Sequence, residues 1–384
     1  MLTSKRAKFT LPPQLTYLNC AYMSPLLKSV EKVGVSAVRK KRNPVNITQQ
    51  DFFTETELLR IEYAKLINAP DPKRIVIIPS VSYGMANVVR NLDIKKGQHV
   101  IVATEQFPSN VYPWQRLCEE AGAQVITIAP PDDYTNRGKH WNEKILESIN
   151  VNTKAVAIGH VHWADGTRFD LEAIRKRTNE VGALLIIDGT QSVGAMPFDL
   201  QRIQPDALIC AGYKWLLGPY SIGLAYYGPN FDNGKPVEEN WINRLNSEDF
   251  AGLVNYQNQY QPGALRYEVG EHSNFILVPM LLKAIQQLNN WGAERIQEYC
   301  RHTGQPVLQK LAEKGFIIED ELWRSSHLFG IRLPGNVNLD DVKKSLLKNK
   351  VYVSFRGNAI RVAPNVYNTQ QDFDKLYKAL TKVL

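Results

Sequence analysis

Between residues 70 and 230, short apolar runs alternate with longer stretches whose apolar positions recur at helical spacing. Runs that are apolar throughout are typical of strands buried on both faces. Strands that alternate with helices in this way predict an α/β fold with a mostly parallel sheet covered by helices. We expect strands at 74–79, 99–102, 125–128, 154–161, 184–187, 207–210 and 222–227, and helices at 82–92, at 111–121 and between Asp170 and Gly182.

After residue 275 the pattern changes to two long amphipathic stretches, several short apolar runs and a final amphipathic stretch. This mixture is typical of a smaller α+β domain. We therefore predict an N-terminal segment (1–20) that packs on the core, a large domain (21–270) and a small C-terminal domain (271–384). In the small domain we expect helices at 275–290, 293–315 and 371–384, and strands at 316–318, 327–333 and 352–355.

Composition excludes several protein classes. The chain has 384 residues, of which 44% are hydrophobic and 22% charged, so it can bury a large core and is not a disordered protein. Its net charge of +8 is spread out apart from one run at Arg39–Arg42, so we expect no nucleic-acid partner. We also expect no membrane helix and no secretory signal. The four cysteines are far apart, which predicts free thiols and a cytoplasmic location.

Two residues at predicted strand ends carry candidate chemistry. Asp188 follows the apolar run 184–187, and Lys214 follows the run 207–210 beside a glycine and aromatic residues. In open α/β sheets, ligands bind at the carboxyl ends of the strands. A buried acid needs a cation, and a lysine among apolar groups has a lowered pKa and attacks carbonyls. Taken singly, however, Asp188 is equally a helix cap and Lys214 a surface lysine.

Together, this lysine and this acid match the needs of pyridoxal 5'-phosphate (PLP), which takes a lysine for its Schiff base and an acid at its pyridine nitrogen. Residues 80–84 (SVSYG) lie between a strand and a helix, where hydroxyls and N–H groups bind phosphate, although a serine helix cap explains them as well. Residues 106–110 (QFPSN) also follow a strand, and Phe107 either stacks on a planar ring or belongs to the core.

The chain resembles the class V aminotransferase family of the fold-type I PLP-dependent enzymes. This family includes cysteine desulfurases, kynureninases, isopenicillin-N-epimerase-like proteins and several aminotransferases. Five segments carry the resemblance, in order and over nearly the whole chain: Thr16–Ala21 with Asn19 and Cys20 ("YLNxA"), Asp188–Gln191 ("DGxQ"), Tyr213–Trp215 followed by Gly218 and Pro219, Arg266–Gly270 ("RxExG") and Ile360–Asn368 ("RxSxxxYNT").

The resemblance implies PLP as cofactor and a homodimer with active sites at its interface. Lys214 would be the catalytic residue and would hold PLP as a Schiff base, and Arg361 would grip the carboxylate of a small amino-acid substrate. The turn 270–274, with Ser273, would reach the phosphate in the partner subunit. The remaining cofactor contacts would come from Val81 (backbone), Ser82 and Tyr213 at the phosphate, Phe107 on the ring face, Asp188 at the pyridine nitrogen and Gln191 at the ring hydroxyl.

The chain departs from cysteine desulfurases on the substrate side. Those enzymes carry a nucleophilic cysteine on a loop before the carboxylate-binding arginine, but residues 301–384 contain no cysteine, so we do not expect a standard desulfurase. Trp163 stands where desulfurases have an asparagine, and it either lines the substrate site or packs in the core. The short loop 355–364 (FRGNAIRVAP) and the Tyr213–Lys214 pair are more similar to kynureninases, although this chain is shorter than those enzymes.

These features lead to two enzyme hypotheses and one from another class. We expect a PLP-dependent enzyme that acts on an amino acid through an external aldimine, most simply as an aminotransferase. The alternative is a PLP-dependent lyase of C–S or C–C bonds, similar to cysteine lyases or kynureninases. A PLP-binding regulatory protein without turnover is the third hypothesis, and the lack of a recognisable DNA-binding module disfavours it.

Overall fold

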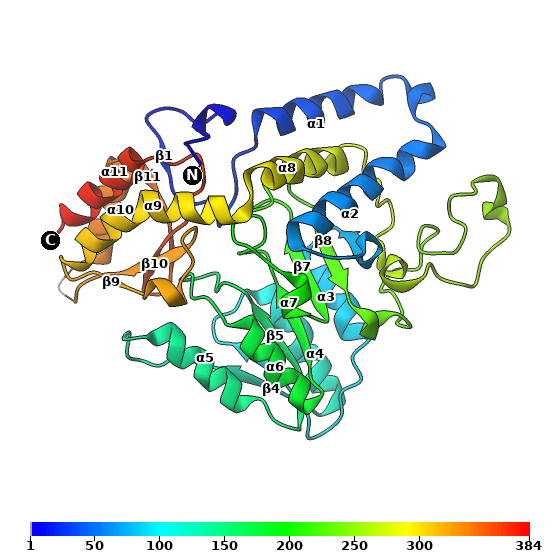
Figure 1. The fold of residues 1–384 in the computed structure, drawn as a ribbon, viewed down its shortest axis with the longest axis horizontal. Coiled ribbons are helices and arrows are strands. Elements are labelled where there is room, and N and C mark those ends of the chain that lie inside the picture. The colour runs from blue at the N-terminus through cyan, green and yellow to red at the C-terminus, as the bar shows by residue number, and fades with distance from the viewer. Residues whose placement is uncertain (1, 336) are drawn as a thin grey trace.

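The structure is a computed structural model that describes residues 2–335 and 337–384, and helices and strands alternate along much of it (Figure 1). The helices are α1 (Lys28–Lys40), α2 (Thr54–Ile67), α3 (Val81–Arg90), α4 (Tyr112–Ala121), α5 (Arg137–Ser148), α6 (Leu171–Val181), α7 (Leu200–Ile203), α8 (Leu277–Trp291), α9 (Ala293–Ala312), α10 (Leu339–Lys348) and α11 (Gln370–Thr381). The strands are β1 (Thr16–Tyr17), β2 (Ile75–Ile78), β3 (His99–Ala103), β4 (Gln124–Ile128), β5 (Thr153–Gly159), β6 (Leu184–Asp188), β7 (Ala207–Ala211), β8 (Gly223–Tyr227), β9 (Ile317–Ile318), β10 (Phe329–Arg332), β11 (Val351–Tyr352), β12 (Ser354–Arg356) and β13 (Ala359–Val362).

A seven-stranded sheet with the order β2-β8-β7-β6-β5-β3-β4 forms the centre of the fold. Its neighbouring strands are parallel except at β8, which runs antiparallel to both β2 and β7. Residues 212–222, which join β7 to β8, contain no helix, and a parallel neighbour would need a longer crossover. The predicted α/β fold with a mostly parallel sheet is confirmed.

Alternation along the strands divides the large core into two layers. In β2, Ile75 and Ile77 face one layer, whereas Val76 and Ile78 face the other. Helices α3 and α4 cover the second layer, and the first layer includes residues of α2, α5, α6 and α8. Helices therefore lie on both faces, and the carboxyl ends of the parallel strands stay open to a ligand.

The C-terminal region has a four-stranded antiparallel sheet with the order β12-β13-β10-β9. Its own core joins this sheet to the second half of α9 and to α10 and α11, whereas α8 packs on α1 and α2 and shares the core of the large sheet (Figure 1). The N-terminal segment is tied in where β1 pairs in parallel with β11. The domain boundary at residue 270 stays a prediction.

Most predicted elements occur within one to three residues of their expected ends, with instructive differences. The strand predicted at 352–355 is two strands, β11 and β12, because Val353 lies between pairings to two different partners, β1 and β13. The helix predicted to reach residue 315 ends at Ala312, and Gly315 follows with a φ of +84°. Helices α1, α2, α5, α7 and α10 were not predicted, and Arg39–Arg42 lies at the exposed end of α1.

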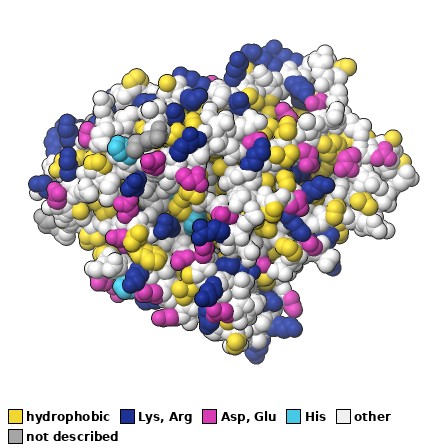
Figure 2. All heavy atoms as spheres, viewed as in Figure 1, with side chains coloured by type: hydrophobic (Ala, Val, Ile, Leu, Met, Phe, Trp, Pro, Cys, Tyr) yellow, Lys and Arg dark blue, Asp and Glu magenta, His cyan; other side chains and the backbone are white. Residues whose placement is uncertain are grey.

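On the face in Figure 2, basic and acidic side chains are interspersed rather than segregated into one stripe. No helix among residues 2–335 and 337–384 combines the length and apolar character required to cross a bilayer. In the same residues, no group of three or more His, Cys, Asp or Glu side chains is placed to hold a metal ion.

Candidate active site

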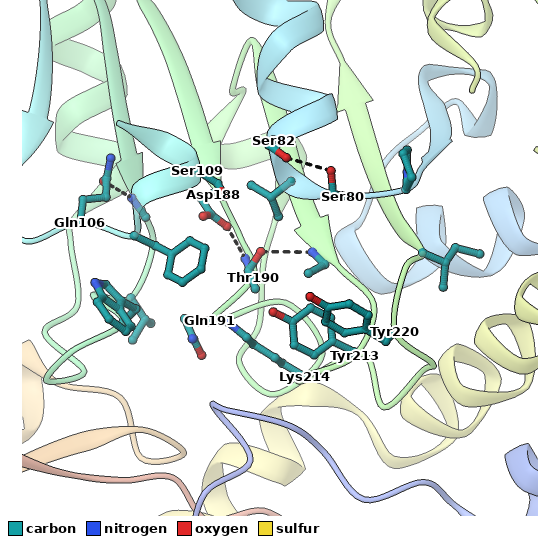
Figure 3. A pocket seen from close by; sticks show the side chains of 18 of the residues that line it. Ser80, Ser82, Gln106, Ser109, Asp188, Thr190, Gln191, Tyr213, Lys214 and Tyr220 are labelled. Atoms are coloured by element: carbon teal, nitrogen blue, oxygen red, sulfur yellow. Dashed lines mark hydrogen bonds between the residues drawn. The ribbon is translucent and has the colours of Figure 1, made fainter. Parts of the chain in front are cut away.

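A cavity of about 300 Å³ opens at the carboxyl ends of β6 and β7, beside the first turn of α3. Figure 3 shows Asp188, Gln191, Lys214 and Tyr213 around this one space. Asp188 and Lys214 lie close together because parallel strands bring the residues at their carboxyl ends to the same edge of the sheet. The predicted site residues on its wall are Val81, Ser82, Phe107, Asp188, Gln191, Tyr213 and Lys214.

Lys214 lies three residues after β7 and is only 6% exposed. Burial lowers the pKa of its amine from 10.5 to about 8; Asp188 opposes this shift, and Arg361 and Arg356 add to it. With this pKa, roughly a tenth of the amine is uncharged at pH 7, far more than for an ordinary lysine. Lys214 is therefore suited to act as a nucleophile and as a base.

Asp188, the last residue of β6, is held in place by Thr190, two residues later in the sequence. Its Oδ1 accepts a hydrogen bond from the Thr190 N–H at 2.9 Å, and Thr190 Oγ1 accepts one from the Ala211 N–H at 3.1 Å. Burial raises the pKa of Asp188, while Thr190 and the charge of Lys214 pull it down. Thr190 thus fixes a buried carboxyl group that needs a cationic partner in the cavity.

The start of α3 offers a cradle for an anion. Ser80 caps the helix by accepting from the Tyr83 N–H at 3.2 Å, and its Oγ lies 2.9 Å from that of Ser82. The N–H groups of Val81 and Ser82 belong to the first turn, where helix geometry supplies no acceptor. In Figure 3 the hydroxyls of Tyr213 and Tyr220 also point into the cavity. Amides, hydroxyls and the helix dipole together favour a phosphate-like group here.

The side-chain amide of Gln191 is held from two sides. Its Oε1 accepts from the Trp215 indole N–H at 2.8 Å, and its Nε2 donates to the Ala21 carbonyl at 3.2 Å. Its backbone carbonyl lies 2.7 Å from His327 Nε2. Gln191 is therefore rigid, and the second proton on its Nε2 remains for a group in the cavity.

Two aromatic residues, Phe107 and Trp163, form the cavity wall beside Lys214. The Lys214 Nζ lies 5.1 Å from the centre of the Phe107 ring, and Phe107 meets Trp163 edge-on at 5.4 Å. Trp163 is half-buried, lines the cavity and donates from its indole N–H to the Glu105 carbonyl at 2.5 Å. The structure therefore places Trp163 in the cavity wall and not in the core.

Arg361 lies in an adjoining cavity that shares Phe107, Trp163 and Lys214 with the first. Its side chain is 1% exposed, and it donates to the Trp163 carbonyl at 2.9 Å and to the Ser354 hydroxyl at 3.3 Å. Both partners are neutral, and in the described part of the chain its Nε has none. Burial and the nearby Arg356 lower its pKa to about 9. A buried cation with neutral partners is costly, so this cavity favours an anion.

Ser273 is the one predicted site residue that lies apart from these cavities. It is buried in the turn before α8, next to His272, whose Nε2 lies 3.0 Å from the Phe52 carbonyl. Its proposed contact with a partner subunit stays a prediction.

Sequence reasoning assigned no role to Thr190, Gln106, Ser109 or Tyr220, which line the cavity. The available signal was their position one to six residues from Asp188, Phe107 or Lys214.

Comparisons with known proteins agree with this geometry. The family described as "Aminotransferase class-V" matches residues 37–376. The uncharacterized aminotransferase YcbU of Bacillus subtilis is 30% identical over 358 residues, which are 92% of this chain and 89% of that protein. A probable cysteine desulfurase of Streptomyces coelicolor is also 30% identical, over 70% of this chain and 63% of its own length.

Solved structures share the fold at low identity. The cysteine desulfurase CsdA of Escherichia coli superposes with a TM-score of 0.83 at 21% identity, and 98% of this chain and 97% of that chain are covered. A complex of the cystine C–S lyase C-DES with cysteine persulfide gives a TM-score of 0.86 at 18% identity, with 97% and 98% covered. At such identities these likenesses establish the architecture alone.

Proposed function

Because the chain belongs to the class V aminotransferase family, we propose that it is a PLP-dependent enzyme acting on an amino acid, with transamination as its first candidate reaction. The observation that carries the proposal is the meeting of Lys214, Asp188 and the start of α3 in one cavity, next to the buried Arg361. Sequence-distant segments supply an amine, an acid, an anion cradle and a second anion site, and few ligand classes need all four.

The residues present fit PLP group by group. The first turn of α3, with Val81 and Ser82, and the Tyr213 hydroxyl would hold the phosphate. Asp188, which needs a cation, would pair with the pyridinium nitrogen, and Phe107 would lie on the ring. When bound, PLP supplies an aldehyde that takes up amines and a ring that withdraws electrons from the substrate.

The chain's own residues then have defined tasks. Lys214 Nζ would attach to the cofactor's aldehyde in the resting enzyme and, once displaced by substrate, would take and return the proton of Cα. Arg361 would fix the α-carboxylate, which sets the direction in which Cα faces Lys214. Phe107 and Trp163 would exclude water from one side of the site.

A C–S or C–C lyase is the second candidate, and one feature of the site favours it over a desulfurase. No cysteine lines either cavity, and the four cysteines, Cys20, Cys118, Cys210 and Cys300, are all buried. Sulfur cleaved from a substrate would have no enzyme thiol to accept it. A C–S cleaving enzyme built on this site would therefore release a sulfur product directly.

The experiment that separates these reactions is a titration of the PLP-loaded protein with an amino-acid panel that includes cysteine, cystine and kynurenine. The visible absorbance of the cofactor is followed, and keto acid, ammonia, sulfide and alanine are assayed. Loss of the resting absorbance band with one equivalent of keto acid would establish transamination. Catalytic pyruvate with ammonia and a sulfur product, or catalytic alanine, would establish a lyase instead. A cofactor that no amino acid perturbs would contradict both and favour a binding protein.

The proposal includes a homodimer. Tyr22 and Tyr220 line the cavity that holds Arg361, yet they are 59% and 62% exposed, and large apolar groups beside a site are typical of surfaces covered by another chain. The turn with Ser273 would face the partner's cofactor there. Light scattering of the purified protein is expected to give the mass of two chains, and a single-chain mass at micromolar concentration would contradict this. A cytoplasmic location stays a prediction.

A further inference from the structure

A third cavity, of about 260 Å³, lies beside Trp163 and is not used by the chemistry described above. It is lined by residues that flank Trp163 in sequence, by the start of α5 and by the loop between β12 and β13. Arg356 lines both this cavity and the one that holds Arg361. The third cavity is therefore a neighbour of the proposed substrate site and shares a side chain with it.

Guanidinium groups outnumber carboxylates in the third cavity. Arg137 and Arg332 each donate to the same oxygen, Asp165 Oδ2, at 2.8 Å. Burial alone would raise the pKa of Asp165, but His162, Arg332 and Arg137 hold it well below its usual range, so this carboxylate is charged. One buried carboxylate thus serves two buried or half-buried cations, and Arg356 is a third cation.

The third guanidinium is the least satisfied. Arg356 Nη1 donates to the neighbouring Phe355 carbonyl at 2.7 Å, and its charge lies 5.0 Å from the centre of the Trp163 ring. Glu105 adds a second carboxylate to the cavity, but its side chain is exposed. The balance of three cations against two acids leaves the cavity with a net positive charge.

The arginines that line the cavity also carry buried donors without acceptors. Among the described residues, the Nε atoms of Arg137, Arg332 and Arg356 are buried without a hydrogen-bond partner, and Arg332 as a whole is 8% exposed. Tyr134, which lies under the Arg332 guanidinium at 4.6 Å, accepts from Asn358 at 2.8 Å and so leaves its own hydroxyl proton available. Guanidinium forks and a phenol are the groups that recognise a carboxylate.

We propose that this cavity binds the side-chain carboxylate of the substrate, so that the enzyme prefers an amino acid with two acid groups. The inference rests on the proposed function of the neighbouring site. Arg361 and Arg356 lie 5.8 and 5.0 Å from the centre of the same Trp163 ring. One small molecule with two carboxylates can therefore place one carboxylate on each arginine. Arg361 holds the α-carboxylate, Trp163 lies along the connecting carbons, and Arg356 with Arg137 and Arg332 receives the second carboxylate.

The test compares two ligands of equal chain length, glutarate and pentanoate, by calorimetric titration of the PLP-loaded protein. Glutarate is expected to bind at least about tenfold more tightly, because its second carboxylate meets guanidinium groups that pentanoate leaves unpaired. In Arg356→Gln the advantage is expected to fall below about threefold. Lys139→Gln, which removes the same charge from an exposed position on α5 outside the cavity, keeps the full advantage.

Arg137→Gln provides a second variant, since Asp165 keeps Arg332 and His162 as partners there. Equal affinity for the two ligands in the wild-type protein would overturn the proposal, as would an advantage that survives both arginine changes. Inorganic phosphate is titrated in parallel. Phosphate binding that depends on Arg356 without any preference for glutarate would mark a site for free anions and would also overturn it. Because glutarate binding needs no turnover, failure of the amino-acid panel would contradict the proposed function and leave this test intact.

Discussion

Replacing Lys214 by alanine is expected to lower kcat/KM by roughly 10²- to 10⁴-fold, because the change removes the group proposed to move the proton at the substrate Cα. The variant is also expected to release PLP on denaturation after borohydride treatment, whereas the wild-type protein retains it on Lys214. Steady-state rates and mass spectrometry of the treated protein measure the two effects. Lys214→Arg keeps a cation in the cavity and should be equally inactive. A variant with more than a tenth of the wild-type rate would remove Lys214 from the chemistry.

The same substitution has a signature in the cofactor-free protein. The folded-state pKa of Lys214, about 8, lies below its ordinary value of 10.5, so between these pH values the unfolded chain binds more protons than the folded one. Wild-type stability is therefore expected to rise with pH from 8 to 10.5 relative to Lys214→Ala, by about 3 kcal/mol at most. Below pH 8 the relative stability should be flat. Urea unfolding at several pH values measures the difference, and parallel curves would show that the lysine is not perturbed.

Replacing Arg361 by glutamine is the second change with a large expected effect. Loss of one partner of the buried pair proposed between Arg361 and the substrate carboxylate costs about 2–5 kcal/mol. We therefore expect kcat/KM for the amino acid to fall by a factor between roughly 30 and more than 10³. Because Arg361 is proposed to act on the substrate carboxylate, KM should carry much of the loss and PLP content should stay unchanged. Arg361→Lys keeps the charge without the planar fork and should recover only part of the activity.

A matched substrate makes the Arg361 experiment specific. An amine that lacks the α-carboxylate gains nothing from Arg361, so wild type and variant should process it at similar, low rates. A variant that loses activity equally toward the amine and the amino acid would indicate a general disturbance of the cavity. Such a disturbance could arise because the change removes the hydrogen bond from Arg361 to the Trp163 carbonyl. An equal loss toward both substrates would contradict a role of Arg361 in carboxylate binding.

The sequence alone made Asp188 and Lys214 candidates for the site, because both lie at or just after the ends of predicted strands. Asp188 and Lys214 follow continuous apolar runs, and a parallel sheet brings such residues to one edge whatever the details of packing. The antiparallel course of β8 was not predictable from the same pattern, since an apolar run has no direction. The outcome depends on the connection 212–222, which is too short for a crossover.

The proposed substrate side of the site could not be derived from local patterns. Arg361 became a candidate only through a motif resemblance, because an isolated arginine on a strand is usually exposed, and its 1% exposure is a property of tertiary packing. The arginine-rich cavity is further from prediction still. Arg137, Asp165 and Arg332 come from a helix, a loop and a strand that no sequence period relates. Buried charge networks of this kind are decided by packing in space.

The pairing of β1 with β11 has a consequence for the way the protein is made. This pairing joins Thr16 to Val351, and Thr16 Oγ1 also donates to Asp372 at 2.9 Å. The N-terminal segment can therefore make these contacts only after residues 351 and 372 have been synthesised. The ribosome releases the N-terminus first, and domains fold as their sequences emerge. The sheet with Asp188 and Lys214 can form early, but the wall that contains Ala21 and Arg361 closes only after synthesis is nearly complete. A nascent chain stalled before residue 351 is therefore expected to lack the cavity wall that holds Arg361.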